Sequence, residues 1–92
     1  MKKFVVVAYD VSDDKRRLKI AKILEGCGVR KNFSVFECML SESEVKSMQK
    51  KVNKLADSKS DCILYYYLCK ACVEKREVVG RQPVAKPEVV LI

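Results

Sequence analysis

Asp10 is the residue whose type and position most suggest chemistry in this sequence. It lies near the end of the apolar run KFVVVAYDV, residues 3–11. A carboxylate that ends an apolar strand is costly if it is buried without a partner, so we expect Asp10 to face a cleft, a cation or the N-terminus of a helix. The chain has no histidine, which excludes Ser–His and Cys–His nucleophiles and histidine-bearing zinc sites. Its three glycines form no Walker or GxGxxG loop, so nucleotide-binding loops are also excluded.

Two acidic neighbours, Asp13 and Asp14, extend the hypothesis for Asp10. The three carboxylates can help to hold Mg²⁺ or Mn²⁺, which take oxygen ligands from carboxylates, water and phosphate. The alternative is structural: Asp10 caps the turn after its strand, while Asp13 and Asp14 complement the start of a helix. In a two-fold homodimer, two Asp10 side chains could instead share one ion at the interface. That ion would lower the pKa of a bound water and neutralise a phosphodiester.

Cys69 and Cys72 form a C-x-x-C pair, a spacing found in zinc sites and thioredoxin-like redox centres. A mononuclear zinc site needs a second ligand pair, and no matching spacing occurs among the other cysteines, Cys27, Cys38 and Cys62. The chain has an odd number of cysteines, five, and most of them lie in apolar runs. We therefore interpret all five as reduced thiols of the core or of turns.

Three consecutive tyrosines, Tyr65 to Tyr67, could stack unpaired bases, as aromatic residues do on the sheets of some RNA-binding folds. Strand alternation places Tyr66 on one face and Tyr65 with Tyr67 on the other. No ribonucleoprotein-type motif accompanies them, so we favour packing in the core and in a dimer.

Composition indicates one soluble, basic domain. The 92 residues are 49% hydrophobic and 34% charged, and 19 Lys and Arg against 12 Asp and Glu leave a net charge of +7. This balance favours a polyanionic partner such as nucleic acid, although a merely soluble basic protein would have the same charge. No run approaches the roughly 20 apolar residues of a membrane span, and the first apolar run is too short for a signal peptide. We expect a cytoplasmic protein whose thin core would gain from a symmetric partner.

The elements that must position Asp10 follow from the periodicity of the chain. Residues 3–11 predict a strand in the middle of a sheet, because the run is continuous and β-branched. An acidic cap at 12–14 begins a helix that ends at Gly26 and Gly28, with Leu18 among its core residues. The exposed face of this helix carries four basic residues: Lys15, Arg16, Lys19 and Lys22.

Residues 29–40 alternate with period two and predict the second strand. Ser41 and Glu44 form a capping box that starts a second helix. Its apolar stripe consists of Val45, Met48, Val52 and Leu55. Residues 62–69 predict a third strand that is too apolar and aromatic for an exposed edge, and residues 77–79 a weaker fourth.

We predict the α+β, ferredoxin-like order βαββαβ, with both helices on one face of an antiparallel sheet. This domain spans residues 1–80. Residues 81–92 form a C-terminal extension that ends in the apolar segment EVVLI. Since this segment has no strand left to pair with in its own chain, we expect it to join the sheet of a partner subunit.

Taken together, these segments resemble the Cas2 family of CRISPR-associated proteins over nearly the whole chain. They read FVVVAYDVSDDKRRLKIAKIL, VRKNFSVFEC, DCILYYYLC, VVG and EVVLI. The most specific element is the strand-ending Tyr-Asp with its acidic turn and arginine-bearing helix, combined with the run Ser34–Glu37. The resemblance implies a ferredoxin-like homodimer in which a C-terminal strand packs on the neighbouring subunit.

The resemblance also implies metal-dependent cleavage of RNA or DNA in some members. By position, Asp10 would be the catalytic residue and would bind Mg²⁺ or Mn²⁺ at the dimer interface. Residues that match positions tied to activity or site architecture are Tyr9, Arg17, Arg30, Ser34 and Phe36. On charge, we expect nucleic acid to contact Arg16, Arg17, Lys19, Arg30 and Lys31.

Two functional hypotheses follow. In the first, the homodimer is a CRISPR adaptation (spacer acquisition) subunit that holds duplex DNA and scaffolds the Cas1 integrase. In the second, it is an endonuclease that hydrolyses single-stranded RNA or duplex DNA with its paired Asp10 residues, an activity that varies between members. Toxin-type endoribonucleases and non-catalytic regulatory domains share the fold and are the alternatives. The chain departs from many relatives at Asn32, where they carry Gln, and it lacks an acidic tail, so its docking to the integrase stays open.

Overall fold

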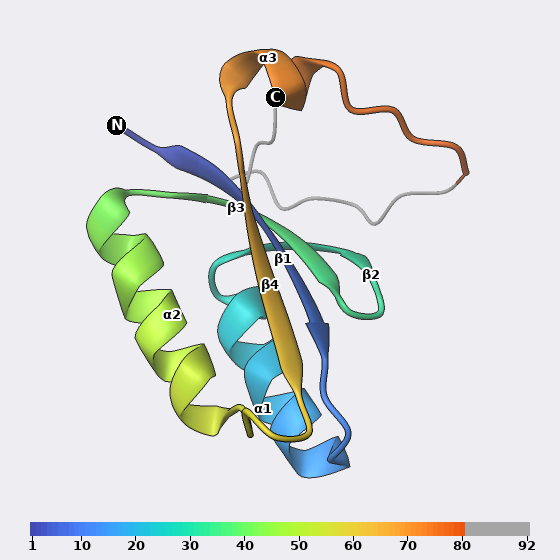
Figure 1. Cartoon of the computed structure of the whole chain (residues 1–92). Helices are drawn as coiled ribbons and strands as arrows, with labels where there is room; N and C mark the ends of the chain where they lie inside the picture. Colours follow the sequence, from blue (N-terminus) through green and yellow to red (C-terminus); the bar gives the residue numbers. More distant parts are fainter. Residues whose placement is uncertain (81–92) are drawn as a thin grey trace.

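The computed structural model describes residues 1–80, which form a four-stranded sheet with its helices. The elements in chain order are β1 (Lys3–Asp10), α1 (Asp14–Glu25), β2 (Gly28–Asn32), β3 (Val35–Leu40), α2 (Glu42–Leu55), β4 (Cys62–Leu68) and α3 (Lys70–Glu74). The strand order is β2-β3-β1-β4, and every neighbouring pair is antiparallel (Figure 1). This confirms the ferredoxin-like βαββαβ arrangement, with the short helix α3 added.

Both long helices cover the same face of the sheet. Alternate residues of β1 and β3 share one core cluster with residues of α1 and α2. The cluster contains Val5, Val7, Tyr9, Phe36, Cys38 and Leu40 from the strands, and Ile20, Ala21, Leu24, Val45, Met48 and Val52 from the helices. The intervening strand residues point to the opposite face, on which neither α1 nor α2 packs. This division matters because Asp10 alternates onto that second face.

The helix starts agree with their predicted caps. Asp13 is the N-cap of α1 and accepts the backbone N–H of Arg16 at 2.9 Å. Ser41 and Glu44 form the capping box of α2, as predicted. Each cap satisfies backbone donors that would otherwise lack partners, so each fixes where its helix begins.

The prediction of one strand over residues 29–40 is wrong. The segment folds back on itself as the hairpin β2–β3, with Phe33 and Ser34 in the turn. The Asn32 side chain accepts the backbone N–H of Phe33 at 2.8 Å, and the pairing register shifts between Arg30 and Asn32. Period-two alternation continues through both arms of the hairpin, so the pattern does not reveal the reversal.

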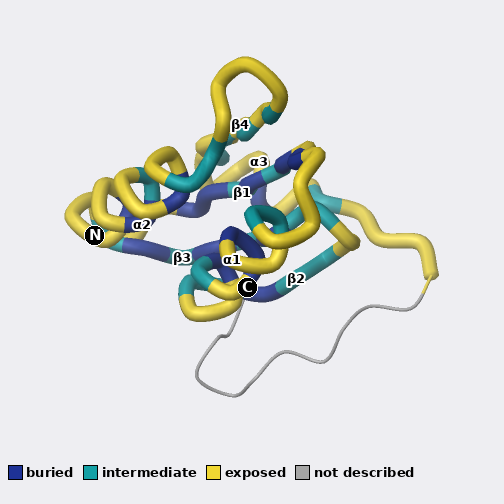
Figure 2. The backbone as a smooth tube through the Cα atoms, turned by 90° about the horizontal axis from the view of Figure 1, so that it is seen from below, coloured by how far each residue is buried: buried dark blue, intermediate teal, exposed yellow. Residues whose placement is uncertain are grey.

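The chain after residue 62 also differs from the prediction. Residues 77–79 form no strand, and the helix α3 precedes them instead. β4 lies at the edge of the sheet, although its composition predicts an interior strand. All of its residues are exposed or half-buried, as Figure 2 shows. Unpaired edge strands are templates for pairing with another chain, and within residues 1–80 the outer side of β4 is such an edge.

The cysteines are less buried than predicted. Cys38 is buried and Cys27 is half-buried, while Cys62, Cys69 and Cys72 are exposed. The predicted alternation of the three tyrosines between the two faces of the sheet is confirmed. Tyr65 and Tyr67 form hydrogen bonds with α2, while Tyr66 lies on the other face. The predicted boundary at residue 80 has no test here, since the extension 81–92 lies outside the described residues.

Candidate functional site

An open hollow of about 590 Å³ lies at the C-terminal end of β1. It collects residues from β1, α1, β2 and the β2–β3 turn, which are far apart in the sequence. The residues that line it are Tyr9, Asp10, Val11, Arg17, Leu18, Ala21, Arg30, Phe33 and Ser34. Five of the residues singled out from the sequence therefore share one wall, and Phe36 lies directly behind it. The antiparallel topology causes this, because it places the β2–β3 turn beside the end of β1.

Tyr9 and Phe36 form the rigid floor of the hollow. Their rings stack with centroids 6.2 Å apart, and Phe36 is fully buried. The Tyr9 hydroxyl donates to the backbone carbonyl of Phe33 at 3.1 Å, while the Tyr9 N–H donates to the Ser34 carbonyl at 3.0 Å. Burial raises the pKa of Tyr9, so the phenol stays protonated and keeps this hydrogen bond. These contacts fix the turn against β1.

Arg17 and Arg30 supply the positive charge of the hollow. Arg17 donates to the Val11 carbonyl at 3.0 Å and forms an ion pair with Asp14. The Arg30 guanidinium lies over the Phe36 ring, 5.2 Å from its centroid, and reaches Glu25 at 3.9 Å. Its Nε atom is buried and has no hydrogen-bond partner. The side chain as a whole is 40% exposed, so the outer part of the guanidinium is accessible to an incoming anion.

Asp10 lies at the rim of this hollow, exposed and opposite Cys62 in the β1–β4 register. The idea that Asp13 and Asp14 join it in one metal cluster is wrong. Asp13 caps α1 and Asp14 pairs with Arg17. Within residues 1–80, no three His, Cys, Asp or Glu side chains are grouped to hold an ion. The structural reading of Asp13 and Asp14 is the one that the contacts support.

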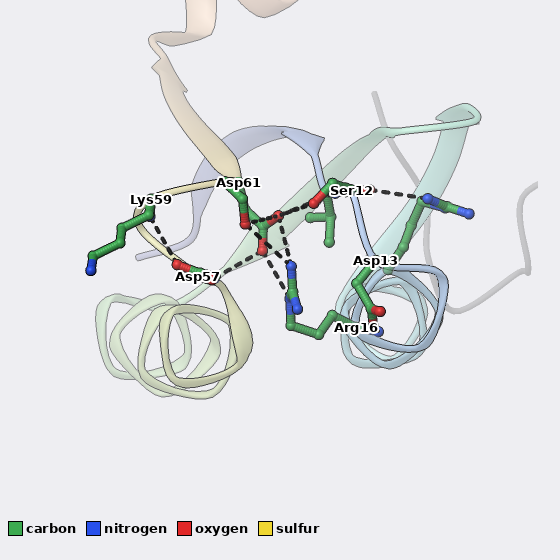
Figure 3. Close-up of polar contacts among 9 residues, drawn as sticks. Ser12, Asp13, Arg16, Asp57, Lys59 and Asp61 are labelled. Carbon is green, nitrogen blue, oxygen red and sulfur yellow. Dashed lines mark hydrogen bonds and ion pairs between the residues drawn. The ribbon is translucent and has the colours of Figure 1, made fainter.

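The other basic residues singled out from the sequence lie apart from the hollow. Arg16 forms two hydrogen bonds to Asp61, at 3.0 and 3.1 Å, in a cluster that joins α1 to the start of β4 (Figure 3). The Arg16 guanidinium and the N–H of Asp57 hold the pKa of Asp61 well below its ordinary value. Lys19 is exposed on α1, and Lys31 lies 4.0 Å from Glu37.

Residues 1–76 match the family model described as CRISPR associated protein Cas2. The chain belongs to the Cas2 family.

Individual members of the Cas2 family are similar over most of the chain. The CRISPR-associated endoribonuclease Cas2 3 of Synechocystis is 42% identical over 82 residues, which is 89% of each chain. The crystal structure of Streptococcus pyogenes Cas2 superposes with a TM-score of 0.75 at 32% identity, covering 84% of this chain and 99% of that one. A chain of a partial Cas6-RT-Cas1–Cas2 complex has the same fold, with a TM-score of 0.72, 24% identity, and coverage of 91% and 98%.

The sequence analysis did not place two apolar residues, Leu18 and Phe33, at the hollow. Leu18 is 69% exposed although helical spacing placed it in the core, and Phe33 is 87% exposed at the tip of the β2–β3 turn. The place of Phe33 in the same hollow as Arg17 and Arg30 could have been predicted only by recognising the β2–β3 hairpin. Over the part of the Cas2-family chain that the structure describes, no helix is long and apolar enough to span a membrane.

Proposed function

We propose that this Cas2-family chain acts as a homodimer that hydrolyses phosphodiester bonds of single-stranded RNA or duplex DNA at paired Asp10 residues. One observation carries the proposal: a single hollow has the exposed Asp10 carboxylate at its rim and two arginines, Arg17 and Arg30, in its wall. A carboxylate suits a divalent cation, and guanidinium groups suit phosphate oxygens. The Synechocystis relative is named an endoribonuclease, which supports RNA as the first substrate to test.

The sheet face opposite α1 and α2 supports dimerisation. Leu64 and Tyr66 of β4 are 45% and 51% exposed there, next to half-buried Val6 and Ala8 of β1. An apolar sheet face of a small domain gains buried area when a second copy covers it. Asp10 belongs to the same face, at the end of the β1 row. A two-fold contact over this face would therefore bring two Asp10 carboxylates towards one axis.

Mg²⁺ or Mn²⁺ fits this chain through the dimer. Of Asp10, Asp13 and Asp14, only Asp10 has no side-chain hydrogen-bond or ion-pair partner within residues 1–80 of a subunit, so two subunits offer two such carboxylates, and these ions accept a few carboxylates with water completing the shell. When bound, the ion would stabilise negative charge on the phosphate and acidify a water molecule.

The residues of the chain have separate tasks in this proposal. Arg17 and Arg30, whose side chains are 44% and 40% exposed, bind the substrate phosphate. Phe36 and Tyr9 hold Arg30 and the turn in place, so they are positioning residues. Asp10 holds the cation and orients the attacking water. The free cysteines fit a reducing cytoplasm, where we place this activity.

The test is cleavage of RNA and duplex DNA with Mg²⁺ or Mn²⁺ by wild type and by Asp10→Asn, after light scattering shows that both are dimers. Glu74→Gln, a remote exposed carboxylate, is the matched control. We expect cleavage to disappear with Asp10→Asn or EDTA and to persist with Glu74→Gln. Cleavage that survives both the Asn variant and EDTA would contradict the proposed Asp10 site and point to a contaminating nuclease.

A second function, scaffolding, is supported by the net charge of +7. We propose that the homodimer also holds duplex DNA and binds the Cas1 integrase in CRISPR adaptation. The exposed lysines of α1, Lys15, Lys19 and Lys22, can contact phosphates without reading sequence. Asp10→Asn should leave duplex binding and Cas1 pull-down intact. No measurable duplex affinity at low salt would favour a regulatory domain instead.

A further inference from the structure

The C-x-x-C pair differs from the other cysteines in its placement. Cys69 is the N-cap of α3 and Cys72 lies in its first turn, and both are exposed and unbridged. Residues three apart on a helix have Cβ atoms about 5–6 Å from each other. A small rotation therefore brings the two sulfur atoms into the range of a disulfide. Of the two placements expected from the sequence, core or turn, the structure excludes the core for this pair.

The two thiols are chemically unequal. The pKa of Cys69 lies below its ordinary value because the backbone N–H and the thiol of Cys72 donate towards its sulfur. The pKa of Cys72 lies above its ordinary value because its thiol is held by Cys69. By contrast, burial raises the pKa of Cys27 and raises that of Cys38 to about 12. Cys69 is thus suited to attack and Cys72 to resolve, while the two shielded cysteines stay unreactive.

Cys69 also lines an open hollow of about 800 Å³ between α2, α3 and the start of β1. Four lysines and two glutamates line the same space: Lys2, Lys3, Lys46, Lys70, Glu42 and Glu74. The excess of positive charge favours an anionic reactant over a neutral one. A metal is less suited to the pair, because no third ligand joins these thiols among the described residues.

We propose that Cys69 and Cys72 form a thiol–disulfide exchange pair whose oxidant is an anionic low-molecular-weight disulfide of the glutathione class. The Cys69 thiolate attacks one sulfur of the disulfide, forms a mixed disulfide and releases one glutathione thiolate. Cys72 then loses its proton to solvent and attacks the Cys69 sulfur. The second glutathione thiolate leaves, so the protein pair is oxidised by two electrons and the small disulfide is reduced by two. The proposal is independent of nucleic-acid cleavage.

The test is mass spectrometry of the reduced full-length protein after timed exposure to glutathione disulfide and acid quenching. Wild type should lose two hydrogen atoms and yield a peptide with Cys69 linked to Cys72. Cys72→Ser should instead accumulate a glutathione adduct on Cys69, and Cys69→Ser should react at least about tenfold more slowly. Cys62→Ser, which removes another exposed thiol, is the matched control and should match wild type. Circular dichroism confirms that each serine variant is folded.

Two further arms test the oxidant and the metal alternative. Salt should slow oxidation by glutathione disulfide and leave oxidation by the neutral 2-hydroxyethyl disulfide unchanged, and Lys46→Gln should reduce the salt effect. The exchange pair is refuted if Cys62 reacts as fast as Cys69 or if Cys72→Ser traps no adduct. Zinc binding that is lost in both variants, without disulfide formation, would assign the pair to a metal between two copies instead. An equal salt response of the two disulfides would overturn the anionic class.

Discussion

Gly28 provides a sharp test of the packing that positions the hollow. It opens β2, which runs so close to β3 that a Cβ at this position would lie 2.2 Å from the Glu37 carbonyl oxygen and 2.7 Å from the Cys38 sulfur. Both contacts are far inside van der Waals distance, and one of them is to backbone. Gly28→Ala can be accommodated only by moving β2 away from β3. Since Arg30 lies two residues further along β2, the same shift would displace it from the hollow.

The expected loss can be compared with that of a neighbouring glycine. Overpacking typically costs about 1–3 kcal/mol, and the backbone clash places Gly28→Ala near or above the upper value. At about 4–8 °C per kcal/mol for a domain of this size, the melting temperature should fall by roughly 10–25 °C. Gly26 is the control, because it is right-handed helical, with φ −77°, and its Cβ would meet only the Ile23 carbonyl at 3.4 Å. Gly26→Ala should be neutral or stabilise by about 0.4–1 kcal/mol.

Thermal unfolding followed by far-ultraviolet circular dichroism measures both variants. All samples need one protomer concentration, because the melting temperature of the proposed dimer would depend on it. Urea denaturation gives the free energy independently. The reasoning is refuted if Gly28→Ala melts with or above Gly26→Ala, since the close approach of β2 to β3 would then be absent.

Three further predictions concern the core, the helix cap and the basic residues. Phe36→Ala should lower the free energy of unfolding by about 3–5 kcal/mol in urea denaturation, because the ring is fully buried. A loss below about 1 kcal/mol would contradict that burial. The backbone N–H of Ser41, the N-cap of α2, donates to the Glu44 carboxylate and is the chief reason why its pKa is lowered to about 2. The ionised carboxylate therefore stabilises the folded protein fully at pH values above its ordinary pKa of 4.5, and this contribution is lost as pH falls towards 2. Glu44→Gln should flatten the pH dependence of stability over that interval, and an unchanged slope would exclude the effect. Lys19→Gln should reduce the salt-dependence slope of duplex binding by about one without lowering the melting temperature. Arg16→Gln should lower the melting temperature because Asp61 loses its paired hydrogen bonds, and equal melting of the two variants would contradict this difference.

Local patterns made much of the fold predictable. The Asp13 cap, the Ser41–Glu44 capping box and the apolar stripe of α2 depend on residues within a few positions of each other. The family was recognisable for the same reason, because the Tyr9-Asp10 step and its acidic turn are contiguous. Such signals need no knowledge of distant contacts.

The errors arose where a pattern is compatible with two structures. Alternation over 29–40 is the same in one strand and in a hairpin, and only the turn at Phe33 and Ser34 separates them. The edge position of β4 depends on sheet order, which no local run encodes. Arg16 looked like a free cation, yet Asp61, 45 residues later, engages it.

The sequence by itself therefore determined the class of fold, the helix caps, the basic charge and Asp10 as the candidate carboxylate, because these depend on residue type and short-range spacing. Only the tertiary structure decided which of the charged residues share a site. It placed Arg17 and Arg30 in the wall of the hollow that has Asp10 at its rim, and it paired Arg16 with Asp61. It also placed Cys69 in the lining of a second open hollow. The reason is physical: side-chain proximity across the sheet is set by strand order and hairpin reversal, and both emerge only when the whole core packs.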